Sequence, residues 1–146
     1  MKNIFTRKNL FIAGVIGLLL SCGNSFSFAK SNISLDEIRA ELACQNDKTS
    51  NDYIKLKNKL DKYILQNNVD YSQKNRLMDA VRLIKEKNYN PAIYELKALI
   101  DENYNKTKCL ELLGDIAIKA TSNISKGVKY YKLALKDNPD NISAAY

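Results

Sequence analysis

The side chains of this chain that could do chemistry are its cysteines and carboxylates, because the 146-residue sequence contains no histidine. Without histidine the chain lacks the usual general base near neutral pH, the Ser-His and Cys-His nucleophile pairs and the commonest zinc ligand. Adjacent carboxylates such as Asp36 and Glu37 point in different directions on a helix, so they do not share a proton. We therefore expect a non-enzymatic protein with no catalytic residue, no cofactor and no metal site.

Glycine, tyrosine and lysine do not indicate a nucleotide or nucleic-acid site either. Gly114 and Gly127 are isolated, which excludes a glycine-rich phosphate loop. The tyrosines are spread singly at helical spacing, as core residues are, and do not form a stacking platform for bases. The net charge is +7, but the lysines alternate with acidic and polar residues, as between Lys55 and Lys62. We therefore expect no nucleic-acid partner.

The first 29 residues have the pattern of a signal peptide. A basic segment ending at Lys8 precedes an apolar run from Leu10 to Leu20, which is shorter than the about 20 residues that a membrane-spanning helix needs. Residues 27–29, Ser-Phe-Ala, offer the small-x-small pattern that a signal peptidase recognises, with cleavage before Lys30. We expect the chain to be exported, to the periplasm or as a secreted protein.

An alternative processing site lies at Cys22. Residues 19–22, Leu-Leu-Ser-Cys, resemble a bacterial lipobox, in which Cys22 would be lipidated and become the mature N-terminus. That lipid would anchor the chain in the bacterial envelope and would be its only contact with the membrane. Because Leu20 is bulkier than the lipobox usually accepts at that position, cleavage after Ala29 is favoured.

Residues 30–70 are expected to form an N-terminal helical hairpin. Ser34 and Glu37 have the spacing of a capping box, which predicts a helix that starts at Ser34. Residues 45–50 are a polar break. A second helix is predicted from about Asn51 to Gln66, because its apolar residues recur every three or four positions.

Residues 71–146 are expected to contain further hairpins. Asp70 and Gln73 make a second capping pair, which predicts the start of a third helix. Asn90 is a good N-cap and is followed by proline, which suits the first position of a helix, so a fourth helix is predicted over residues 91–102. A fifth and a sixth helix follow, ending before the proline at position 139.

The last of these hairpins has a recognisable pattern. Its small and apolar residues match two spacings, W-x2-L-G-x2-Y and the later A-x3-F…P, which are typical of the tetratricopeptide (TPR) repeat. The matching residues are Leu110, Leu113, Gly114, Ala117, Gly127, Tyr131 and Pro139. The stretch from Leu110 to Asn141 therefore resembles a TPR repeat, and a weaker match covers the third and fourth helices. In this pattern Gly114 lets the paired helix come close, and Tyr131 fills the wedge between the two helices.

The resemblance implies an all-α fold, an α-solenoid of about three helical hairpins of which the last two are TPR-like. It also implies a protein-binding function, because the leading helix of each TPR repeat lines a concave groove. The positions that match groove-facing ones are Lys74, Leu77, Val81, Ile84, Lys85, Lys108, Glu111, Asp115, Ile118 and Lys119. The alternative for Leu77, Val81 and Ile84 is that they pack against the core.

In a regular stack of hairpins Cys44 and Cys109 would lie two units apart. A disulfide needs two α-carbons within about 7 Å, so we expect both thiols to stay free.

We expect a protein-protein interaction module of the cell envelope that binds a peptide or protein partner. The partner would lie in the TPR-type groove or on the open C-terminal edge. At this edge the sixth helix is expected to bury Val128, Tyr131 and Leu135, and to leave Tyr130 and Leu133 on a flank that residues 142–146 are too few to cover. The alternative is a structural or accessory lipoprotein subunit of an envelope assembly, with self-association into a homo-oligomer through this edge.

Overall fold

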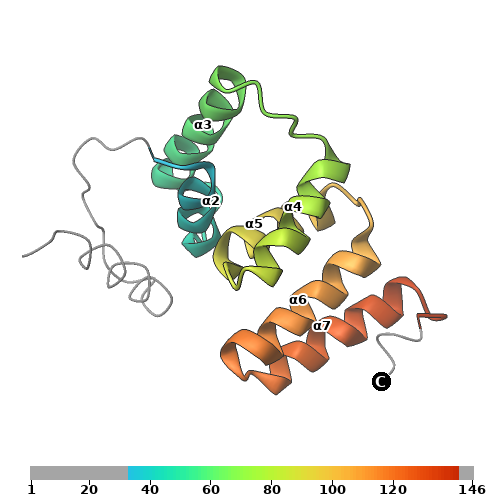
Figure 1. The fold of residues 1–146 in the computed structure, drawn as a ribbon. Coiled ribbons are helices and arrows are strands. Elements are labelled where there is room, and N and C mark those ends of the chain that lie inside the picture. Colours follow the sequence, from blue (N-terminus) through green and yellow to red (C-terminus); the bar gives the residue numbers. More distant parts are fainter. Residues whose placement is uncertain (1–32, 142–146) are drawn as a thin grey trace, which may run out of the picture. The chain divides into compact units, whose positions relative to one another are not determined.

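The structure is a computed structural model that describes residues 33–141 of the chain (Figure 1). These residues form six helices and no strand: α2 (Leu35–Cys44), α3 (Asn51–Gln66), α4 (Gln73–Lys85), α5 (Tyr89–Asp101), α6 (Lys106–Thr121) and α7 (Ile124–Asp137). The expected all-α, solenoid-like class is therefore confirmed. None of these six helices is long and apolar enough to cross a bilayer. The signal peptide predicted over residues 1–29, the lipobox cysteine Cys22 and residues 142–146 lie outside the described residues.

The first two helices begin as their sequences predict. The Ser34 hydroxyl accepts the Glu37 backbone N–H at 3.2 Å, and the Glu37 carboxylate accepts the Ser34 backbone N–H at 2.7 Å. The predicted capping box is therefore present, and it satisfies two N–H groups that α2 would otherwise leave without partners. Ser50 caps α3 by accepting the Tyr53 backbone N–H at 3.1 Å.

The start of α4 differs from the prediction. Its N-cap is Ser72 and not Asp70. The Asp70 carboxylate instead accepts the Ser72 backbone N–H and the Asn75 side-chain amide, at 3.1 and 2.6 Å. Asp70 therefore shapes the turn before the helix, because Asp side chains readily accept from the backbone N–H two residues later.

The start of α5 also differs from the prediction. The helix begins at Tyr89 with Asn88 as its N-cap, so the predicted cap Asn90 lies inside the first turn. Pro91 is then the third residue of the helix. It is tolerated there because the first N–H groups of a helix have no intrahelical acceptor, so proline loses no hydrogen bond.

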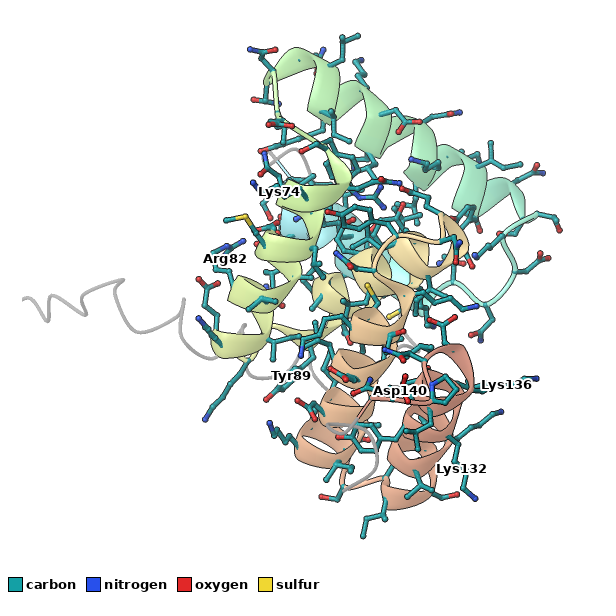
Figure 2. The ribbon with its side chains drawn as sticks, turned by 90° about the vertical axis from the view of Figure 1, so that its right-hand side faces the viewer. Lys74, Arg82, Tyr89, Lys132, Lys136 and Asp140 are labelled. Carbon is teal, nitrogen blue, oxygen red and sulfur yellow. The ribbon has the colours of Figure 1, made fainter. Side chains whose placement is uncertain are left out.

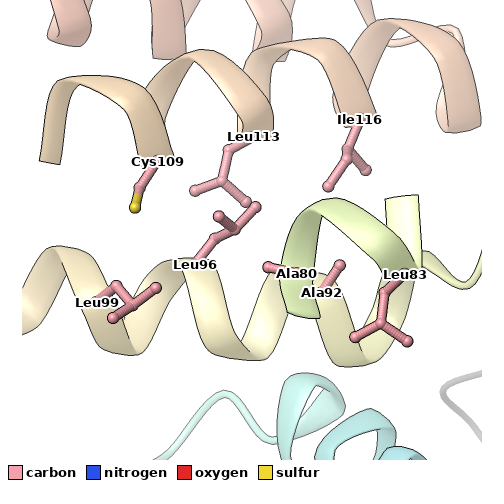
Figure 3. Close-up of a cluster of buried hydrophobic side chains, with 8 residues drawn as sticks. All are labelled: Ala80, Leu83, Ala92, Leu96, Leu99, Cys109, Leu113 and Ile116. Atoms are coloured by element: carbon pink, nitrogen blue, oxygen red, sulfur yellow. The ribbon is translucent and has the colours of Figure 1, made fainter. Parts of the chain in front are cut away.

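Helix α5 is the element that connects the rest of the fold. It packs against α2, α4 and α6, whereas α3 packs against α2 and α7 packs against α6. One core cluster joins α4, α5 and α6 (Figure 3) and contains Ala80, Leu83, Ala92, Leu96, Leu99, Cys109, Leu113 and Ile116. A second cluster joins α2 and α3 to α5 through Ile38, Leu42, Leu60 and Tyr94.

Helices α6 and α7 approach closely at two glycines. A Cβ atom on Gly114 would lie 2.6 Å from the ring of Tyr131, and one on Gly127 would lie 2.5 Å from Ile118. Real Cβ contacts are longer than this, so each helix requires glycine where it crosses its partner. The predicted roles of Gly114 at a close crossing and of Tyr131 in the wedge are confirmed.

Candidate functional site

Glu95 of α5 is fully buried and lies between two arginines from other helices. Arg39 of α2 forms an ion pair with Glu95, with Nε 2.6 Å from Oε1, but the N–H is not directed at this oxygen and makes no hydrogen bond. Arg76 of α4 donates a hydrogen bond from Nε to Glu95 Oε2 at 2.8 Å. The Tyr71 hydroxyl donates to Oε1, and both guanidinium carbons lie over its ring, 5.4 and 4.9 Å from the centroid. One carboxylate therefore ties α2, α4 and α5 together.

Acidic residues at the edge of this cluster bind the outer nitrogens of the two arginines. Arg39 Nη1 donates to Asp79 at 2.5 Å and to Asp36 at 3.2 Å. Arg76 Nη1 donates to Glu102 at 2.6 Å. The buried positive charges are thus paired and hydrogen-bonded, which is what makes burial of a charge tolerable.

The two arginines and the tyrosine of the cluster keep their protons at physiological pH. Burial would lower the pKa of Arg39 and of Arg76, but Glu95 together with Tyr71, and with Asp79 for Arg39 and Glu102 for Arg76, outweighs it, so the pKa of both is raised. Burial and the charge of Glu95 also raise the pKa of the Tyr71 hydroxyl. Glu95 is enclosed, so a substrate has no access to it. We therefore regard this cluster as structural.

The ten predicted groove positions lie on α4 and α6 and differ in exposure. Leu77 and Ile84 pack against the core cluster of α4, α5 and α6, which favours the core alternative for these two residues. Val81 is half-buried. The exposed positions are Lys74, Lys85, Lys108, Ile118 and Lys119.

The two acidic groove positions are bonded within the chain. Glu111 is buried and accepts from Lys108 Nζ at 2.9 Å and from the Asn141 side-chain amide. Asp115 accepts the Tyr131 hydroxyl at 2.6 Å and lies 3.6 Å from Lys119 Nζ. Burial and Asp115 raise the pKa of Tyr131 to about 12, so this hydrogen bond persists at physiological pH. Both carboxylates already have partners within the chain, so they are poorly placed to bind a ligand.

A polar depression of about 360 Å³ opens at the start of α6. Its lining is Asn105, Lys106, Thr107, Lys108, Glu111, Asn138 and Asn141. Its lysines are paired: Lys106 Nζ lies 3.3 Å from Asp137, and Lys108 binds Glu111. The depression therefore has no uncompensated charge to attract a ligand.

The outer face of α7 has a different character. It forms an open depression of about 550 Å³ lined by Ser125, Val128, Lys129, Lys132, Leu133 and Lys136. Val128 and Leu133 are each 41% exposed, and Ile124 at the start of the helix is 66% exposed. Figure 2 shows Lys132 and Lys136 pointing away from the helices. Apolar and basic side chains thus share one uncovered surface, which we call the α7 outer face (residues 124–136).

The lysines of the α7 outer face have no partner among the described residues. Of the 13 other lysines in residues 33–141, six form ion pairs and seven, including Lys126 of α7, do not. The paired lysines are Lys48, Lys55, Lys57, Lys106, Lys108 and Lys119. Within residues 33–141, Lys129, Lys132 and Lys136 form no ion pair. Their positive charge is available to a ligand.

The inner face of α7 corrects an expectation from the sequence. Tyr130 packs against the core cluster, and Val128 lies on the outer face, so the two residues exchange their expected places. The reason is the position of Gly127 at the crossing with α6. At 3.6 residues per turn, position 130 lies nearer than position 128 to the side that Gly127 turns towards α6.

The three lysines of the α7 outer face were not predicted as site residues. A usable signal was present, because α7 contains four lysines and a single acidic residue, Asp137. Comparisons of the chain with protein-family models, with curated proteins and with solved structures give no significant match. The TPR resemblance therefore stays a prediction.

Proposed function

We propose that the chain is a non-enzymatic protein-interaction module that binds a protein partner through the α7 outer face. The observation that carries the proposal is the combination of exposed Val128 and Leu133 with three lysines that form no ion pair within residues 33–141. Exposed apolar side chains that gather on one surface usually mark a contact surface. Uncompensated charge beside them gives such a surface selectivity for its partner.

Two features support binding over catalysis. The chain has no histidine, and its most buried carboxylate, Glu95, is enclosed by two arginines that hold it in place. The resemblance of residues 110–141 to a TPR repeat supports the same class of function, since TPR repeats bind proteins.

The proposed place of action is the bacterial envelope. This part of the proposal rests on the signal-peptide pattern of residues 1–29, which would deliver the chain to the periplasm or outside the cell. The alternative is a lipid at Cys22, which would hold the same module at a membrane.

Site-specific photo-crosslinking tests the proposed function. A photo-reactive residue replaces Lys132 in the full chain, which is expressed in its native cells. In a matched variant the same photo-reactive residue replaces Lys62, an exposed residue of α3. We expect a discrete protein adduct from position 132 that is absent from position 62 and is lost in Leu133→Asp. Identical adducts from both positions, or none from position 132, would contradict the proposal.

A further inference from the structure

The lysines of the α7 outer face form a row along the helix. Gly127 and Ala134 are buried against α6 and define the inner side of α7. At 3.6 residues per turn, Lys129, Lys132 and Lys136 lie on the opposite side, one in each successive turn. A second helix lying along α7 would therefore meet one lysine for each of its own turns.

Apolar residues flank this row on both sides. Val128 lies on one side of the lysines and Leu133 on the other, and both line the same depression. A helix that lies in a bilayer surface has the reverse order, with apolar residues at the centre of its buried face and basic residues at the rim. The pattern on α7 thus fits a protein surface with a charged centre and apolar sides better than it fits a membrane.

Neither α7 nor the parts of the chain outside the described residues offer the complementary charge. Asp137, the acidic residue of α7, is bonded to Thr107 at 2.6 Å and to Lys106 at 3.3 Å. Residues 1–32 and 142–146, which lie outside the described part of the chain, contain neither Asp nor Glu. A second copy packed by two-fold symmetry would place lysines against lysines, since such an interface pairs a surface with itself.

We propose that the α7 outer face binds an acidic helix of another protein. The ligand would carry Asp or Glu once per turn, at i, i+3 or i+4, and i+7, with apolar residues on both sides of this row. The methylene stems of the lysines would add to the apolar contact while their ammonium groups meet the carboxylates. This inference rests on the proposed function and specifies the chemistry of the partner.

A displayed library of helical peptides provides the test. In each peptide a central row at i, i+3 or i+4, and i+7 is randomised among Asp, Glu, Gln and Lys, and the positions on both sides of this row carry variable apolar residues. The library is selected on the full chain and, in parallel, on a charge-reversed variant with Lys129→Glu, Lys132→Glu and Lys136→Glu. A matched variant reverses three exposed lysines elsewhere that are unpaired within residues 33–141, namely Lys59, Lys62 and Lys97.

We expect selection on the wild-type chain to enrich Asp and Glu at the positions of the central row. The enriched peptides should bind the matched variant as they bind wild type, but the α7 variant about tenfold more weakly. Their affinity should fall as the salt concentration rises, because the lysines are exposed. The charge-reversed chain should instead enrich Lys, and circular dichroism of that chain should show unchanged helix content.

Three results would overturn the inference. The first is selected peptides with the same Asp and Glu content as the starting library, or selected peptides that bind the α7 variant and the matched variant equally well. Another is concentration-dependent dimerisation of the chain in sedimentation that Lys132→Glu alters, which would make a second copy the occupant. The third is tighter binding to anionic vesicles or to a DNA duplex than to any selected peptide. A protein adduct from position 132 together with any of these results would leave the proposed function standing and refute only its acidic specificity.

Discussion

Tyr131 of α7 lies directly against Gly114 of α6, where a Cβ atom would come within 2.6 Å of the aromatic ring. The Tyr131 hydroxyl is meanwhile held by Asp115, one residue further along α6. Because the ring is fixed at its far end, it cannot swing away from an added side chain without losing this hydrogen bond. The crossing of α6 and α7 is therefore intolerant of any side chain at position 114.

Gly114→Leu should destabilise the chain strongly. Overpacking of a tight contact costs about 1–3 kcal/mol or more, because side chains and backbone must shift. Ala120→Leu, at an exposed position of the same helix, is the control and should leave stability nearly unchanged. Thermal and urea denaturation measure both. An unchanged melting temperature for Gly114→Leu would show that the crossing is not tight.

Glu95→Gln should also be strongly destabilising. It leaves Arg39 and Arg76 buried without their shared counter-charge, and breaking a buried pair in this way costs about 3–5 kcal/mol. Glu86→Gln is the control, because it breaks an exposed pair with Arg82 worth about 0–1 kcal/mol. Urea denaturation compares the two. Similar losses of stability in both variants would mean that the buried cluster does not hold α2, α4 and α5 together.

The same cluster should make the chain sensitive to acid. Burial raises the pKa of Asp79 and of Glu102, but hydrogen bonds from arginines outweigh it and the net pKa of both lies below the ordinary values of 3.8 and 4.5. A carboxylate with a lowered folded-state pKa stabilises the fold above the unfolded-state value. This contribution is lost as the pH falls through the folded-state value.

The urea midpoint should therefore be steady down to about pH 5 and fall below it. In a variant with Asp79→Asn and Glu102→Gln the midpoint at neutral pH should be lower and its decline in acid shallower. An equally steep decline in this variant would assign the acid sensitivity to other groups.

Cys109 should be a poor nucleophile in the folded chain. Burial raises its pKa to about 11 from 9.0, although the charge of Arg76 works in the opposite direction. The Cys109 thiol donates to the Tyr104 carbonyl oxygen at 3.6 Å and forms no disulfide within the described residues. Between pH 9 and 11 the unfolded chain would ionise this thiol and the folded chain would not, so stability should decrease as pH rises.

The measurement uses a variant with Cys22→Ser and Cys44→Ser, in which Cys109 is the remaining cysteine. The rate of maleimide labelling with pH should show an apparent pKa near 11 in the folded chain and near 9 in urea. Equal values in both conditions would show that the thiol is open to solvent.

The mature N-terminus should distinguish the two export patterns. Mass spectrometry of the chain from the envelope fraction should give a species that begins at Lys30. A diacylated species that begins at Cys22 would refute cleavage after Ala29 and support the lipoprotein alternative.

Features set by neighbouring residues could be predicted from the sequence. The capping box at Ser34 and Glu37, the bounds of α3 and the close crossing at Gly114 all depend on patterns within one helix or one hairpin. The predicted N-caps of α4 and α5 were wrong by two residues. Several polar residues near each helix start could act as the N-cap, and local hydrogen bonds decide which of them does.

The buried cluster could not be predicted in the same way. The partners of Glu95 come from α2 and α4, so their identity depends on tertiary packing. A partial signal exists, because Arg39 stands between Ile38 and Leu42 on an otherwise apolar stripe. A charged residue in such a position requires a buried partner, but nothing in the sequence says which one.

The contact of α2 with α5 has a consequence for how the chain folds. In a simple repeat array each unit touches only its neighbours, so folding can start anywhere and spread. Arg39 and Glu95 belong to helices with two other helices between them in the chain. This pair raises the contact order, so the part from α2 to α5 should fold late and all at once, whereas the local hairpin of α6 and α7 can form early. A chain that emerges N-terminus first, whether during synthesis or during export, would therefore have an incomplete N-terminal half until α5 has emerged.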